Sequence, residues 1–129
     1  MTAMMSKGDS TLRVPHPLPD PLVDLIAERF RVMGEPVRIK LLDRLRDGEA
    51  SVGQLTEALG ATQQNVSRHL AVLHAAGIVA RRKDGTRVVY AIADETIFAL
   101  CETVCGALQQ SVAELAQLLD GASWSGSPG

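Results

Sequence analysis

The sequence predicts a mainly α-helical domain that carries one small β-hairpin. Aromatic residues make up only 3% of the 129 residues, so the core must be built from Leu, Val, Ile and Ala, a composition that favours packed helices over a large sheet. Apolar residues recur at three- and four-residue steps from Leu22 to Leu73, and the period changes to two residues between Ile78 and Ile92. The length suits one domain with a single core, since about 100–200 residues per domain is usual.

The two ends of the chain are expected to be flexible. Four prolines alternate with other residues from Pro15 to Pro21, which excludes a regular helix there and predicts an extended arm over residues 1–20. Residues 121–129 are small and polar around a single Trp and predict a flexible tail. Residues 21–120 are therefore expected to form the domain.

The first two helices follow from apolar stripes. One helix begins near Leu22 and ends at Gly34, and the next has Pro36 in its first turn and ends at Asp47-Gly48. The two stripes consist of Leu22, Leu25, Ile26, Phe30 and Met33, and of Val37, Leu41, Leu42 and Leu45.

Two short helices follow, each with its own start and stop signals. Ser51 and Gln54 have capping-box spacing and open the third helix, which Gly60 closes. Thr62 caps a fourth helix that ends at Gly77. The apolar residues of these helices are Leu55 and Leu59 in the third, and Val66, Leu70 and Leu73 in the fourth.

A β-hairpin and a long helix complete the domain. Residues 78–83 and 86–92 flank Asp84-Gly85, a pair typical of a hairpin because the turn needs positive φ. Asp94 then caps a final helix that runs to about Leu119.

The final helix has an apolar seam whose steps alternate between four and three residues, as in helices that pair with another helix. The seam consists of Ile97, Cys101, Val104, Leu108, Ser111, Leu115 and Leu118. A small domain needs only part of this helix for its own core, so a second copy of the chain is expected to cover the rest. The alternative is that the whole seam packs within one chain. The expected dimer interface is Leu25, Ile97, Cys101, Val104, Leu108 and Leu115.

Positive charge gathers in one stretch of an acidic chain. Residues 62–90 hold five Lys and Arg against one Asp, although the formal net charge of the chain is -2. Two short helices followed by a basic hairpin are typical of a winged helix-turn-helix. The fourth helix would present amide, hydroxyl and guanidinium groups to base edges, and the hairpin would present cations to phosphates or a minor groove. The expected DNA-binding residues are Thr62, Gln63, Gln64, Ser67, Arg68, His69, Arg81, Arg82, Lys83 and Arg87.

Two interpretations of this region are less specific. His69 is either a phosphate contact or a structural support, and His74 is structural or exposed. The charges as a whole could be a solvated face on a generic helical bundle. The order of capped short helices, polar helix face and basic Asp-Gly hairpin favours DNA binding.

Three segments resemble the arsenic-repressor (ArsR/SmtB) family of bacterial winged-helix regulators: MGEPVRIKLLDRL, SVGQLTEALGATQQNVSRHLAVLHAAGIV and RRKDGTRVVYAI. The resemblance covers roughly Leu22 to Leu119. It implies a homodimer, joined through its terminal helices, that represses transcription and leaves its operator when an inducer binds. We expect it in the cytoplasm, associated with the nucleoid when bound to DNA, because no apolar run approaches the ~18 residues that span a bilayer and the N-terminus lacks a secretory signal.

Both metal sites of that family are unmatched here. The family's CVC segment aligns with Ser51, Val52 and Gly53, which offer no thiolate. Its second site uses an Asp, two His and a Glu, and the aligned residues are Asp94, Thr96, Ala107 and Gln110.

Cys101 and Cys105 remain as candidates for sensing an inducer. They are four residues apart and share one helical face, so a symmetric dimer would offer up to four sulfurs to As(III), Zn(II) or Cd(II). The same thiols could instead form disulfide or polysulfide bridges, more readily between subunits than within one strained pair. A third interpretation makes both of them inert core residues.

An enzyme is not expected, because the sequence contains no recognisable nucleophile elbow, phosphate-binding glycine loop or paired-carboxylate cleft. Two alternatives to an inducible repressor stay open. One is a winged helix that binds an acidic protein through its hairpin, and the other is a DNA regulator without a small-molecule effector.

Overall fold

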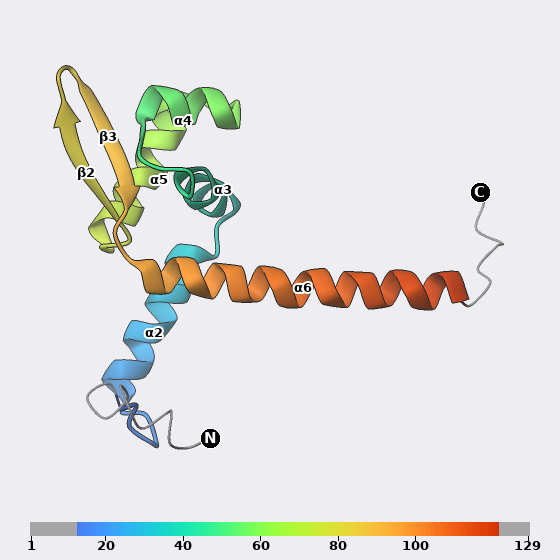
Figure 1. Cartoon of the computed structure of the whole chain (residues 1–129). Coiled ribbons are helices and arrows are strands. Elements are labelled where there is room, and N and C mark those ends of the chain that lie inside the picture. Colours follow the sequence, from blue (N-terminus) through green and yellow to red (C-terminus); the bar gives the residue numbers. More distant parts are fainter. Residues whose placement is uncertain (1–12, 122–129) are drawn as a thin grey trace.

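The structure is a computed structural model that describes residues 13–121. Its elements form the predicted winged helix-turn-helix, with a helical body, a β wing and two protruding helices (Figure 1). In chain order they are α2 (Asp20–Met33), α3 (Pro36–Leu45), β1 (Ala50–Ser51), α4 (Val52–Leu59), α5 (Gln63–Ala75), β2 (Val79–Asp84), β3 (Arg87–Ile92) and α6 (Glu95–Gly121). Residues 1–12 of the predicted arm, and the tail from residue 122 on, lie outside the described residues. No helix of the described part is long and apolar enough to cross a membrane.

Local hydrogen bonds fix the turn between α4 and α5, as the sequence predicted. Ser51 Oγ accepts the N–H of Gln54 at 3.1 Å, and the Gln54 side chain accepts the N–H of Ser51 at 2.9 Å, which completes the capping box. Gly60 ends α4 at a φ of 65°, a left-handed conformation that suits glycine. Thr62 Oγ1 then accepts the N–H of Asn65, so α5 begins at a defined residue.

The wing is a three-stranded antiparallel sheet in the order β1-β3-β2. The predicted hairpin forms between β2 and β3, with Asp84 paired to Arg87 at its tip. The strand β1 was not predicted from the sequence; its Ala50 and Ser51 pair with Tyr90 and Val89. A two-residue strand is too short to produce a periodic pattern.

The hydrophobic core lies between α3, α4, α5 and the inner face of the wing. Its largest fully buried side chains are Leu41, Leu55, Val66, Leu70, Leu73 and Ile78. This confirms the buried face predicted for the fourth helix. The core therefore fixes the orientation of α5 relative to the wing.

The start of α2 corrects the prediction for the proline-rich arm. The helix begins at Asp20 and has Pro21 in its first turn, where a missing N–H breaks no helical hydrogen bond. The prolines therefore exclude a regular helix only as far as Pro19, one residue short of the expected boundary.

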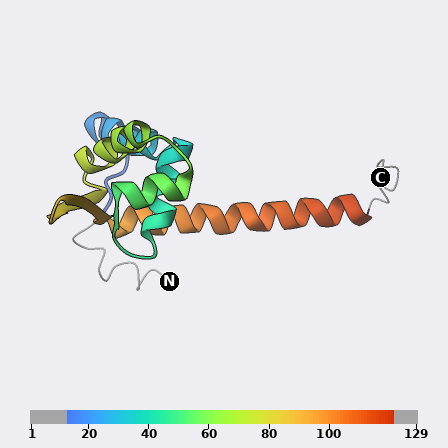
Figure 2. The ribbon, with the colours of Figure 1, turned by 90° about the horizontal axis from the view of Figure 1, so that it is seen from above.

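Both α2 and α6 extend away from the helical body (Figure 1), and Figure 2 shows the same for α6 from above. Of the apolar stripe predicted for α2, only Met33 is buried, and Leu25 is 68% exposed. On α6, Ile97 is buried and Cys101 is half-buried, but the seam beyond them is exposed. The alternative that the whole seam packs within one chain is therefore wrong. The exposed large apolar residues of α6 are Val104, Leu108, Val112, Leu115, Leu118 and Leu119.

Candidate nucleic-acid interface

The exposed side of α5 bears the groups expected to contact bases. Its solvent-facing polar residues are Gln63, Gln64, Ser67 and Arg68. Arg68 Nη2 donates to Asn65 Oδ1 at 2.6 Å, which holds the guanidinium along the helix surface. Such amide, hydroxyl and guanidinium groups match the donors and acceptors of base edges in a major groove.

His69 does not belong to this exposed side. It is only 9% exposed, and its Nδ1 has no hydrogen-bond partner in the described part of the chain. Its Nε2 lies 3.9 Å from a carboxylate oxygen of Glu35, the residue that caps α3. His69 thus leaves the set of expected phosphate contacts, and its burial favours the structural alternative. The sequence does indicate this burial: His69 follows Val66 by three residues and precedes Leu73 by four, and residues at such steps lie on one face of a helix.

The face of the wing that looks toward α5 bears Arg81 and Lys83. Directly paired residues of an antiparallel sheet point to the same face, and Arg81 pairs with Tyr90, which is buried in the core. A cleft of about 660 Å³ lies between this face and the start of α5. Its lining residues are Val52, Gln63, Ser67, Arg81, Arg82, Lys83, Val88 and Tyr90.

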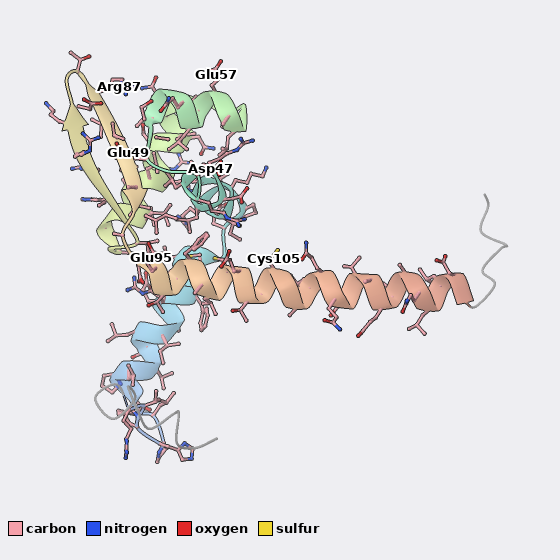
Figure 3. The ribbon with its side chains drawn as sticks, viewed as in Figure 1. Asp47, Glu49, Glu57, Arg87, Glu95 and Cys105 are labelled. Atoms are coloured by element: carbon pink, nitrogen blue, oxygen red, sulfur yellow. The ribbon has the colours of Figure 1, made fainter. Side chains whose placement is uncertain are left out.

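The other two cations of the wing are held by carboxylates. Arg82 forms two hydrogen bonds to Glu49, from Nε at 3.1 Å and from Nη2 at 2.5 Å. Glu49 raises the pKa of Arg82 through these hydrogen bonds and its charge. Arg87 Nη2 lies 3.4 Å from Asp84 Oδ2 at the wing tip, and Figure 3 labels both Glu49 and Arg87 along the wing. Neither pair was predicted from the sequence, in which the four wing cations look alike.

A junction of α2, α5 and α6 lies at the far end of α5. Arg29 Nη1 donates to the Ala76 carbonyl at the C-cap of α5 at 2.6 Å, and Nη2 lies 3.4 Å from Asp94 Oδ2. Asp94 Oδ1 accepts the N–H groups of Thr96 and Ile97, which confirms Asp94 as the cap of α6. One arginine therefore links both protruding helices to the end of α5.

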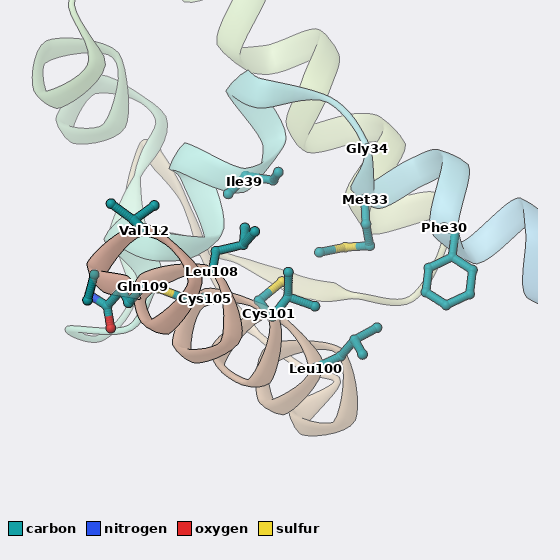
Figure 4. Close-up of a pocket in the computed structure, with 12 residues that line it drawn as sticks. Phe30, Met33, Gly34, Ile39, Leu100, Cys101, Cys105, Leu108, Gln109 and Val112 are labelled. Carbon is teal, nitrogen blue, oxygen red and sulfur yellow. The ribbon is translucent and has the colours of Figure 1, made fainter. Parts of the chain in front are cut away.

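An apolar groove of about 770 Å³ runs along α6 and contains both cysteines (Figure 4). Cys101 is half-buried, and burial raises the pKa of its thiol, whereas Cys105 is exposed. In a single chain Cys105 is therefore not a core residue. No group of three or more His, Cys, Asp or Glu side chains placed to hold a metal ion occurs within residues 13–121. The large apolar side chains that also line the groove include Phe30, Met33, Ile39, Val104, Leu108 and Val112.

A helix-turn-helix with a polar exposed face beside a cationic wing defines the winged-helix class of DNA-binding proteins. The sequence profile described as "Bacterial regulatory protein, arsR family" matches residues 35–81. The chain is 37% identical over 109 residues to the uncharacterized HTH-type transcriptional regulator Rv0081 of Mycobacterium tuberculosis, a match that covers 81% of this chain and 96% of that protein. The chain therefore belongs to the ArsR family of DNA-binding transcriptional regulators, which are not enzymes.

Other relatives agree with this assignment. The HTH-type transcriptional regulator KmtR of M. tuberculosis is 41% identical over 83 residues, which cover 64% of each chain. The crystal structure of Rv0081 has a TM-score of 0.68 at 35% identity and covers 74% of this chain and 97% of that one. The solution structure of the DNA-binding domain of Mb0332 from Mycobacterium bovis, described as homodimeric, has a TM-score of 0.58 at 33% identity and covers 74% and 83% of the two chains.

Proposed function

We propose that this regulator is a homodimeric repressor that binds its operator through α5 and the wing and leaves it when an inducer acts on α6. The observation behind this proposal is the cleft that places Arg81 and Lys83 beside the exposed start of α5. Specific binding to a duplex needs base-contacting groups and phosphate-binding cations side by side.

In this proposal, α5 supplies sequence information. Gln63 and Gln64 pair with adenine and Arg68 with guanine, each through two hydrogen bonds, and Ser67 offers a hydroxyl to either base. Thr62 Oγ1 accepts the N–H of Asn65, and the N–H groups nearer the start of α5 can donate to a phosphate beside it.

The wing supplies affinity and alignment on the duplex. Arg81 and Lys83 form no ion pair within the described part of the chain, so their full charge is available to phosphates. Arg82 and Arg87 already form ion pairs with Glu49 and Asp84 in the protein without DNA. They would therefore contribute less than Arg81 and Lys83 to the interaction with phosphates.

A second copy of the chain is the proposed cover for the apolar faces of α2 and α6. Leu25, Val104, Leu108 and Leu115 are exposed in the single chain, and Cys101 is half-buried beside them. A protein in water gains free energy when such a continuous apolar surface is covered. Ile97 leaves the expected interface, because it is already buried in its own chain. The description of the M. bovis relative as homodimeric supports the same assembly.

Cys101 and Cys105 are the proposed response element. Both thiols line the groove on α6, where a dimer would bring two such pairs near each other. Four sulfurs suit thiophilic ions such as As(III), Zn(II) or Cd(II), and the same thiols suit polysulfide or oxidants. A bound ion or a new covalent bridge there would shift α6, on which the proposed dimer depends.

Fluorescence anisotropy with the reduced protein tests this proposal. We expect the DNA upstream of the protein's own gene to bind about 10³-fold or more tighter than a scrambled duplex, and one of As(III), Zn(II), Ni(II) or polysulfide to release it. Specific binding that none of these reagents disturbs would leave a regulator without such an effector. No preference for the upstream duplex would favour the alternative that the wing binds an acidic protein.

A further inference from the structure

One acidic residue of the described chain is joined to the wing by two hydrogen bonds. Glu49 lies immediately before β1, and its two carboxylate oxygens accept Nε and Nη2 of Arg82 at 3.1 and 2.5 Å. The two residues are 33 positions apart in the sequence. Both carboxylate oxygens and two of the three guanidinium nitrogens are therefore committed to this contact.

The wing topology places this ion pair across β3. Because β3 is the central strand, Ser51 of β1 and Arg82 of β2 both pair with Val89. Directly paired residues share a face, so the Arg82 side chain leaves the sheet on the Val89 face, opposite to Arg81 and Lys83. The Glu49–Arg82 pair thus bridges the two outer strands. Arg82 also lines the cleft beside Arg81 and Lys83, which brings it near the proposed path of the duplex.

The pair also changes the charge that the wing offers to a duplex. A carboxylate a hydrogen-bond length from the guanidinium cancels most of its attraction for a phosphate several ångströms further away. By contrast, Arg81 and Lys83 have no carboxylate partner among the residues described. Glu49 also repels phosphates itself, as any acidic residue there would.

We propose that Glu49 sets the DNA affinity of this regulator by withholding Arg82 from the phosphate backbone. The inference rests on the proposed placement of the wing against the duplex. Because a phosphate contact is independent of sequence, Glu49 lowers the affinity for every duplex by the same factor and leaves the preference for the operator unchanged.

Glu49→Gln tests this proposal, since it removes the charge and keeps the shape. Released Arg82 then neutralises one more phosphate, so the plot of log affinity against log salt concentration becomes steeper by about 0.9. At about 0.1 M salt this corresponds to roughly eightfold tighter binding, on upstream and scrambled duplexes alike. Anisotropy titrations on both duplexes at four salt concentrations give both quantities.

Asp47→Asn is the matched control. Asp47 lies two residues before Glu49 in the segment between α3 and β1 (Figure 3) and forms no ion pair within residues 13–121. Its neutralisation changes the net charge by the same amount and releases no arginine, so we expect a smaller gain in affinity and an unchanged salt slope. Thermal unfolding of both variants checks that the fold is intact.

The second control is the same substitution in a chain that lacks the arginine. Glu49→Gln in an Arg82→Ala background should retain only the gain seen for Asp47→Asn. The proposal is overturned if Glu49→Gln leaves the affinity and salt slope unchanged or lowers them. It is also overturned if Asp47→Asn raises both by as much as Glu49→Gln does, or if the full gain in affinity persists without Arg82. Arg81→Ala tests the placement of the wing separately: without any loss of affinity in that variant, the wing does not meet the duplex.

Discussion

At the scale of single residues, the proposed base contacts come from α5 and the proposed phosphate contacts from the wing. Loss of a base contact should therefore change sequence preference, and loss of a phosphate contact should change affinity for every duplex. Arg68→Ala is expected to cost about 1–3 kcal/mol on operator DNA and to relax the sequence preference. Arg81→Ala should weaken all duplexes alike and lower the salt slope by about one unit. Titrations on operator and scrambled duplexes measure both effects. Equal losses for both variants on both duplexes would contradict this division of roles.

The cysteines give a second residue-level prediction. Replacing Cys101 and Cys105 together by Ser should leave operator binding intact and abolish release by the inducer, as followed by anisotropy. A double variant that is still released normally would show that the thiols are not the sensor.

The two thiols should also differ in their rates of reaction. Because burial raises the pKa of Cys101, less of it is thiolate at neutral pH, and its alkylation should accelerate as the pH rises toward that pKa. Cys105 is exposed and should react first. Mass spectrometry after brief iodoacetamide treatment at pH 7 and pH 9 separates the two sites. Faster labelling of Cys101 at pH 7 would contradict this order.

Residue roles were predictable from the sequence where they depend on local spacing, and less so where they depend on distant partners. The Ser51 and Thr62 caps act within three residues and were recognised. The Glu49–Arg82 pair joins residues 33 positions apart, which no local pattern records. The spacing of His69 from Val66 and Leu73 places it on the buried side of the helix, but its polar ring also suits a phosphate contact, so its role stayed ambiguous.

At the scale of elements, the Arg29 junction is expected to stabilise the attachment of both protruding helices to α5. Arg29→Ala removes a hydrogen bond to the Ala76 carbonyl and an ion pair with Asp94. Since Arg29 is partly exposed to water, we expect a loss of only about 1 kcal/mol in the free energy of unfolding, measured by urea denaturation.

Arg31→Ala provides the control for that measurement. Arg31 lies on the same helix, and its partner Glu28 is exposed and three residues away. Such a pair contributes about 0–1 kcal/mol, so this variant should unfold close to the wild type. If Arg29→Ala were no more destabilised than Arg31→Ala, the junction would contribute nothing beyond an ordinary surface contact.

The elements themselves were predicted well, because each is delimited by a cap, a glycine or a change of period. The exceptions are β1, which exists only through its pairing with β3, and the start of α2, where Pro21 is tolerated in the first turn. The burial of α2 was less predictable, because an apolar stripe indicates a face to be covered without saying which chain covers it.

At the scale of the whole molecule, the exposed seam of α6 predicts that assembly depends on a few leucines. Leu115 is 55% exposed and far from the core, so Leu115→Glu should leave the winged domain folded and place a charge in the proposed interface. We expect sedimentation to change from dimer to monomer, with a large loss of operator affinity. Gln117→Glu adds the same charge at an exposed polar position and should remain dimeric. A dimeric Leu115→Glu variant would contradict the proposed interface.

The 27-residue α6 is about 40 Å long, and little of its apolar face is covered in one chain. If two chains must meet before either can hold an operator, then at concentrations below the dimer dissociation constant the amount of competent repressor varies with the square of the chain concentration. Halving the number of chains in a growing cell would then leave about a quarter of the repressor. Because α6 is too long to be covered within one chain, a gradual fall in chain concentration would thus cause a steeper fall in repressor and an abrupt onset of transcription.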